Sequence, residues 1–193
     1  MTMNTRQLRS TYQLKISLEG TKPPIWRRLL VSSDIKLDIF HLALQITMGW
    51  NNSHLHHFIS QEQKFYGIKD DDFEVEGFEM HDESATRLSK LLKIEKDSLI
   101  YEYDFGDGWM HKVLLEKTLP FDPAKKLPYC VIGKRACPPE DCGGIWGYAN
   151  LLAILNNPEH KEYEEMLEWL GDEFDPAYLG RREINQLLLE YCR

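Results

Sequence analysis

The chain has 193 residues, of which 42% are hydrophobic and 28% are charged, and its formal net charge is −8. A chain of this length can bury a core of its own, and its longest apolar stretches are far too short to span a membrane. The excess of acidic residues disfavours broad binding to nucleic acid, because an acidic surface repels phosphate groups.

The first residues and the cysteines indicate a cytoplasmic protein. The N-terminal segment lacks the apolar run of a signal peptide, so we expect no export. Four cysteines in such a chain favour reduced thiols over a disulfide framework. The charge is uneven, since residues 1–30 hold six Lys and Arg against one acid. A small basic face there, with Arg27 and Arg28, could still meet a phosphate.

Apolar periodicity predicts two strands and a helix in the first part of the chain. Apolar and polar residues alternate at 12–18, as in a half-buried strand, and residues 25–31 are expected to return beside it after a Pro-Pro break. A helix is expected at 37–48, with Gly49 as its C-terminal cap. Its apolar stripe consists of Phe40, Ala43, Leu44, Thr47 and Met48.

The remaining elements predict an α+β fold. Further strands are expected at 54–60, 64–68, 99–105 and 109–116, and short or amphipathic helices at 86–92, 146–155, 158–170 and 182–191. Residues 70–83 carry eight acids and no Lys or Arg, so a loop is expected there. We predict one domain over residues 1–193, strand-rich at 10–117, a long loop at 118–145 and helical at 146–193. Its antiparallel sheet should have about five strands.

The densest cluster of reactive side chains lies on the hairpin at residues 101–111. If Asp107-Gly108 forms a two-residue turn, Asp104 lies opposite His111, with the two Cβ atoms roughly 5 Å apart. A carboxylate facing an imidazole suits acid–base catalysis or metal binding. A three-residue turn would instead place Tyr103 opposite His111. Asp104 and Asp107 could equally serve the turn itself.

A histidine-rich strand and a cysteine-containing loop are further candidates. In a strand, His54 and His56 share a face and His57 takes the other, so His54 and His56 could bind a divalent metal with His111 or Asp104. Half-exposed histidines bonded to a neighbouring carboxylate are the alternative. Three thiols, Cys130, Cys137 and Cys142, hint at zinc, but their spacing lacks the paired pattern of structural zinc sites.

Several motifs in order resemble the plasmid pRiA4b ORF-3-like family. They are Trp26-Arg-Arg, Met48-Gly-Trp50, His54-Leu-His-His-Phe58, residues 103–111, residues 135–144, Trp169-Leu-Gly and Phe174-Asp-Pro176. The resemblance spans residues 12–188 and implies a compact α+β domain on an antiparallel sheet. Members occur in bacteria and archaea, some on plasmids or beside insertion elements, and the resemblance brings no catalytic residues. Cys142 stands where the family has a small apolar residue, which weakens the zinc interpretation.

Three hypotheses of function follow. The first is a cytoplasmic accessory protein whose cleft binds a small molecule or a partner protein, with association to mobile elements or plasmids. The cleft would be lined by Trp50, Asp107, Trp109, Glu140 and Asp141. The second is an enzyme that uses Asp104 and His111 as an acid–base pair, with a metal at His54 and His56. The third is a nucleic-acid-associated factor that uses Arg27 and Arg28.

Overall fold

The computed structural model describes residues 9–69, 79–171 and 174–192. This part of the chain forms one sheet of eight strands in the order β5-β4-β3-β6-β7-β1-β2-β8. Every neighbouring pair is antiparallel except β4 and β5, which run parallel. The strands are β1 (Ser10–Leu18), β2 (Ile25–Ser32), β3 (His56–Ile59), β4 (Phe65–Gly67), β5 (Met80–Asp82), β6 (Ser98–Tyr103), β7 (Trp109–Pro120) and β8 (Tyr129–Lys134).

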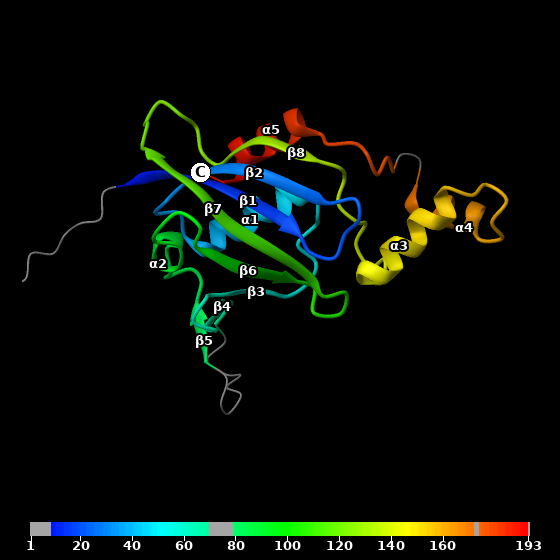
Figure 1. Ribbon diagram of the computed structural model, residues 1–193, viewed down its shortest axis with the longest axis horizontal. Coiled ribbons are helices and arrows are strands. Elements are labelled where there is room, and N and C mark those ends of the chain that lie inside the picture. The colour runs from blue at the N-terminus through cyan, green and yellow to red at the C-terminus, as the bar shows by residue number, and fades with distance from the viewer. Residues whose placement is uncertain (1–8, 70–78, 172–173, 193) are drawn as a thin grey trace, which may run out of the picture.

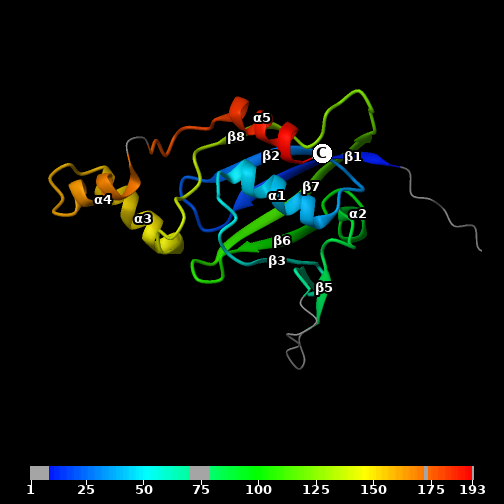
Figure 2. The same ribbon diagram turned by 180° about the vertical axis from the view of Figure 1, so that it is seen from behind.

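Helices cover one face of this sheet, and further helices lie beyond one of its ends. They are α1 (Leu37–Met48), α2 (Leu88–Leu91), α3 (Gly144–Leu155), α4 (Tyr163–Leu170) and α5 (Arg181–Tyr191). Figure 1 shows β7, β1 and β2 in front of α1, and Figure 2 shows α1 and α5 in front of the strands. In both views α3 and α4 lie beyond one end of the sheet. No helix within the described ranges combines the length and apolar character needed to cross a membrane.

The core lies between the sheet and α1, as the apolar alternation predicted. Tyr12, Leu14, Ile16 and Leu18 of β1 are all buried, whereas the residues between them are only partly so. The predicted stripe of α1 is buried completely, and Gly49 ends the helix with a φ of 89°. Since this left-handed conformation is easily adopted only by glycine, the helix ends where the sequence indicated.

The α+β class is confirmed, but the prediction of about five strands was too low. β5 lies inside the expected acidic loop, of which residues 70–78 are outside the described residues, and β8 lies inside the expected loop 118–145. Both strands are at the edges of the sheet. Only Cys130 of β8 is buried, and all of β5 is half-exposed. The alternation that reveals a strand is therefore missing from both.

Candidate functional site

The hairpin between β6 and β7 has a five-residue turn, and this overturns the Asp104–His111 pair. Tyr103 pairs with Trp109, and Tyr101 lies opposite His111. Asp104 takes a φ of 56°, and its Oδ1 accepts hydrogen bonds from the backbone N–H groups of Gly106 and Asp107. The turn thus uses Asp104, as an Asx-type turn does. The three-residue alternative, with Tyr103 opposite His111, is also wrong.

His111 belongs to the core. Its side chain has no exposed surface, and its Nδ1 lies 3.1 Å from the carbonyl oxygen of Tyr101. Nε2 has no hydrogen-bond partner among the described residues. Burial lowers the pKa of His111 to about 4, so the imidazole is neutral near neutral pH. A group so enclosed can neither meet a substrate nor join His54 on a metal.

His56 does not join His54 among the potential metal ligands of the described residues, because β3 begins at His56 and His54 lies in a bend before it. His56 is buried and stacks on His41, with ring centroids 3.4 Å apart, and its Nε2 lies 2.8 Å from Glu83. His57 points to the other face, as predicted, and pairs with Glu102 at 2.7 Å. These two histidines follow the alternative interpretation, in which a strand histidine bonds to a nearby carboxylate.

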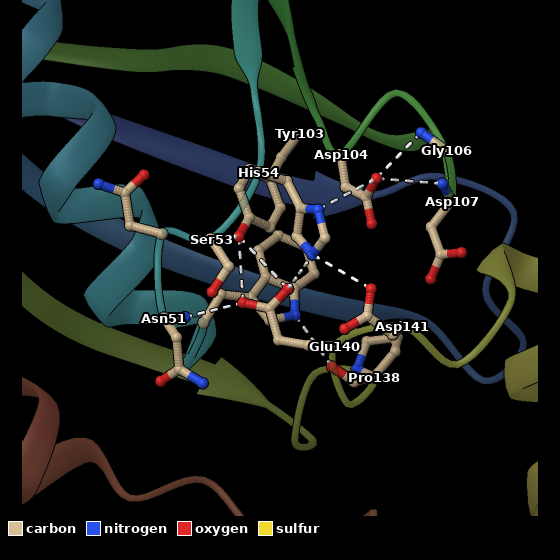
Figure 3. Close-up of polar contacts among 12 residues, drawn as sticks. Asn51, Ser53, His54, Tyr103, Asp104, Gly106, Asp107, Pro138, Glu140 and Asp141 are labelled. Atoms are coloured by element: carbon tan, nitrogen blue, oxygen red, sulfur yellow. Dashed lines mark hydrogen bonds and ion pairs between the residues drawn. The ribbon is translucent and has the colours of Figure 1, made fainter.

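His54 lies instead among three carboxylates at the end of the hairpin. Asp104 Oδ1 is 3.8 Å from its Nδ1, while Asp141 Oδ1 and Glu140 Oε2 are 3.2 Å and 3.8 Å from its Nε2. Figure 3 shows the imidazole between Asp104 on one side and Glu140 and Asp141 on the other. Of the His, Cys, Asp and Glu residues that the structure describes, only His54, Asp104 and Asp141 bring three ligand atoms within 4.8 Å of one another. We call His54, Asp104, Glu140 and Asp141 the His54 cluster.

The donors of the His54 cluster differ in how open they are. The side chain of Asp104 is 8% exposed, that of His54 27% and that of Asp141 71%. Nε2 of His54 is shielded from solvent and makes no hydrogen bond within the described part of the chain, because the contact with Asp141 lacks hydrogen-bond geometry. One wall of the cluster is therefore buried, and the other opens to solvent at Asp141.

Glu140 is held in place by the segment after α1 and by the end of β6. Its Oε1 accepts a hydrogen bond of 2.8 Å from the backbone N–H of Asn51, and both of its oxygens accept from the hydroxyl of Tyr103. Burial, with Glu140 nearby, raises the pKa of Tyr103 to about 12, so the hydroxyl remains a donor. Sequence reasoning missed this role of Tyr103, whose only local signal is its position directly before Asp104.

The loop that carries Glu140 and Asp141 is fixed to the same hairpin, so the hairpin, the segment with His54 and this loop meet in space. The indole of Trp50 donates a hydrogen bond to the carbonyl oxygen of Pro138, and the N–H of Gly143 donates to Asp107 Oδ2. Trp50 and Trp109, expected to line a cleft, are 6% and 0% exposed and lie in the core. Asp107 contacts the loop, and Glu140 and Asp141 reach the cluster.

Gly144 controls how closely this loop approaches the hairpin. It has a φ of 66°, and a Cβ there would lie 2.5 Å from the carbonyl oxygen of Asp107. We expect Gly144→Ala to lower the free energy of unfolding by about 3 kcal/mol, because left-handed strain adds to the clash. The matched control is Gly108→Ala, which has the same strain at a φ of 67° but open space, and should cost about 1 kcal/mol. Urea denaturation of both variants measures this difference, and equal losses would contradict the close approach.

The cysteines and arginines lie elsewhere. All four cysteines are free, and no thiol joins a set of three potential metal ligands within the described residues, so the zinc hypothesis for Cys130, Cys137 and Cys142 finds no site. Arg27 is 2% exposed, so it offers no open surface to the phosphate backbone of a nucleic acid. Arg28 is on the opposite face of β2 and forms an ion pair with Glu116, at 2.6 Å.

These features define an α+β protein with one largely antiparallel sheet and a histidine–carboxylate cluster beside its central hairpin. The chain belongs to the plasmid pRiA4b ORF-3-like family, whose model matches residues 10–183, which confirms the resemblance seen in the motifs.

Two relatives share nearly the whole chain. The first is the uncharacterised protein y4hQ of Sinorhizobium fredii, which is 35% identical over 181 residues, covering 92% of this chain and 90% of that protein. The second is the crystal structure of a protein of unknown function, MM3350, from Methanosarcina mazei Go1. It has 39% sequence identity and a TM-score of 0.83, and the match covers 91% of this chain and 97% of that one. One relative is described as uncharacterised and the other as of unknown function, so a function for this chain is inferred from the geometry of the His54 cluster.

Proposed function

We propose that the protein is a cytoplasmic accessory protein that binds a divalent cation at the His54 cluster and uses the loaded cluster to hold a ligand or partner. The observation that carries this proposal is the position of one imidazole within 4 Å of three carboxylates. The carboxylates also bring negative charge together, and a cation bound by His54, Asp104 and Asp141, whose ligand atoms lie within 4.8 Å of one another, would offset it. Imidazole nitrogen and carboxylate oxygen are both common ligands of divalent metals.

The mixed donors favour Zn²⁺ over other cations, with Mn²⁺ as the second choice. Mg²⁺ and Ca²⁺ prefer oxygen ligands alone, whereas imidazole suits zinc. Three protein ligands with one open position are typical of zinc sites that exchange a ligand. Here the open side would be that of Asp141, which is the most exposed donor. A carboxylate or water from a partner or small molecule could complete the coordination there.

The cellular setting is part of the same proposal. The description of the family, plasmid pRiA4b ORF-3-like, supports an association with plasmids or other mobile elements. A metal-dependent enzyme is the second candidate, favoured by the opening of the cluster to solvent at Asp141. Such an enzyme would work at the His54 cluster, because the buried His111 cannot take part.

Calorimetric titration of the protein, purified without a histidine tag, tests the binding of Zn²⁺ and Mn²⁺. We expect one Zn²⁺ per chain and a loss of about 100-fold in affinity for His54→Ala, since even outer-sphere partners of a metal are worth about 10–100-fold. His57→Ala is the matched control, because His57 also pairs with a carboxylate but lies outside the cluster. The proposal fails if no stoichiometric binding is seen, or if both variants lose affinity equally.

A further inference from the structure

Arg27 places a cation inside the protein, on the helix-covered face of the sheet. It follows the alternation of β2, in which Ile25, Leu29 and Val31 are also buried, and it is 2% exposed. Buried arginines are almost always paired with an acid, because an isolated charge is costly away from water. No carboxylate of the described residues forms an ion pair with Arg27. Its neighbour Arg28, in contrast, is paired with Glu116.

The donors of Arg27 are satisfied on one side only. Its Nε donates to the carbonyl oxygen of Thr47, and its Nη1 donates to those of Trp26 and Lys134, at 2.8–3.0 Å. Its Nη2 meets only the sulfur of Cys137, at 3.5 Å. A guanidinium has two hydrogens on this nitrogen, and a thiol is a weak acceptor. The Nη2 side therefore has capacity for a stronger acceptor.

Cys137 does not supply the missing negative charge. Burial raises the pKa of its thiol to about 11, although Arg27 acts in the opposite direction, so the thiol is neutral near neutral pH. Arg27 also opposes the protonation of His111 and favours the thiolate of Cys130. The positive charge thus acts on three surrounding groups.

A cavity of about 410 Å³ adjoins Arg27 and Cys137. Its walls are mainly apolar side chains from α1, α5 and the two loop segments 136–139 and 174–180, among them Ile46, Met48, Phe174, Ile184 and Leu187. Glu183, the one acid among the described lining residues, is exposed on α5. The volume falls within the range of about 300–1,000 Å³ that is typical of small-molecule sites.

We propose that this cavity binds an apolar monocarboxylate of the medium-chain fatty acid class. Its carboxylate would accept hydrogen bonds from Arg27 at the Nη2 side, and its hydrocarbon chain would lie against the apolar side chains of α1 and α5. The buried cation selects an anion, and the apolar walls select a hydrocarbon rather than a phosphate or a sugar acid. This site is separate from the His54 cluster, although one loop serves both: its residues 137–139 line the cavity, and Glu140 and Asp141 belong to the cluster.

Decanoate and decan-1-ol, compared on the wild-type protein, test the proposal without any variant. We expect saturable one-to-one binding of decanoate in calorimetric titrations below its micelle concentration, and binding of the alcohol at least about tenfold weaker, because the alcohol lacks the charge. EDTA in the buffer removes any contribution of a cation at the His54 cluster, so the result is independent of the proposed function. Absence of saturable decanoate binding, or equal binding of acid and alcohol, overturns the proposal.

Substitutions then locate the site. Arg27→Met should reduce decanoate binding to the level of the alcohol, whereas Arg28→Met, on the opposite face of the same strand, should leave it unchanged. Ile184→Trp on α5 should block both compounds, because the larger ring fills the cavity beside Ile184. If Arg27→Met fails to fold, Ile184→Trp decides the location. Undiminished decanoate binding by a folded Ile184→Trp variant overturns the assignment of the cavity.

Discussion

The free energy of unfolding is expected to fall by about 4 kcal/mol when the pH is lowered from about 7.5 to about 5, because two histidines are buried in their neutral form. Burial is the main cause that lowers the pKa of both His41 and His111 from 6.5 to about 4. His56 lowers that of His41 further, and Arg27 lowers that of His111. The hydrogen bonds of His41 with Asn52 and of His111 with the Tyr101 carbonyl act in the opposite direction.

The direction follows from which state binds the proton. Below a pH of 6.5 the unfolded chain takes up a proton at each histidine, while the folded protein does so only near its own pKa of about 4. The stabilisation by each neutral histidine is therefore fully present above its pKa of 6.5 in the unfolded chain. It is lost as the pH falls towards its pKa of about 4 in the folded protein, and the loss reaches about 2 kcal/mol per histidine at about pH 5. The lowered pKa values of Asp34 and Glu116 act below this window, since their ordinary values are 3.8 and 4.5.

Urea denaturation at the two pH values measures the effect. His41→Gln and His111→Gln should each remove a large share of the pH-dependent loss, and the double variant should leave only the contribution of His57, whose pKa burial also lowers. His160→Gln, outside the core, controls for the removal of a histidine as such. A wild-type protein with equal stability at both pH values would show that these imidazoles are not held neutral.

Trp109→Ala is expected to lower the free energy of unfolding by about 3–5 kcal/mol, the usual range when a large aromatic is removed from a core. Trp109 is fully buried and packs on Trp50, with ring centroids 6.0 Å apart. Because it starts β7 directly after the turn, its loss also weakens the frame that positions Asp104 and Asp107. The matched control is Trp146→Ala, which removes the same side chain where it is 87% exposed and should change stability by less than about 0.5 kcal/mol.

A third variant separates packing from polarity at this position. The Nε1 of Trp109 has no hydrogen-bond partner within the residues that the structure describes. Trp109→Phe removes that buried donor together with part of the ring, so we expect a smaller loss than for alanine. Denaturant midpoints at constant slope give the ranking. A loss for Trp146→Ala as large as that for Trp109→Ala would contradict the placement of the two rings.

Strands and helices with a clear apolar period were predictable, and the edges of the sheet were not. The helix Leu37–Met48 and its glycine cap were correctly placed, because both signals lie within the helix itself. β5 and β8 were missed because an edge strand exposes much of its surface and shows no alternation. Their pairing depends on a neighbouring strand that is distant in sequence.

The hairpin shows why the candidate site was only partly predicted. The observed register differs by three positions from the expected one, and an odd shift moves every side chain to the other face. The observed register turns Tyr101, Tyr103, Trp109 and His111 into the core, which buries more apolar surface than a two-residue turn would. His111 thereby left the candidate site, while His54 and Asp104, which the sequence suggested as joint ligands of a metal, came together.

The sequence by itself determined the α+β class, the core faces of β1 and α1, and the family. Only the tertiary structure decided which side chains face one another beside the hairpin. Glu140 is bonded to Asn51, 89 positions away, and no local period encodes such a contact. It also decided that Arg27 lies inside, with no ion-pair partner among the described residues, and that Arg28 lies outside and pairs with Glu116, because adjacent residues of a strand point to opposite faces. The sequence indicates which residues of a strand share a face, whereas packing against the helices decides which of the two faces is buried.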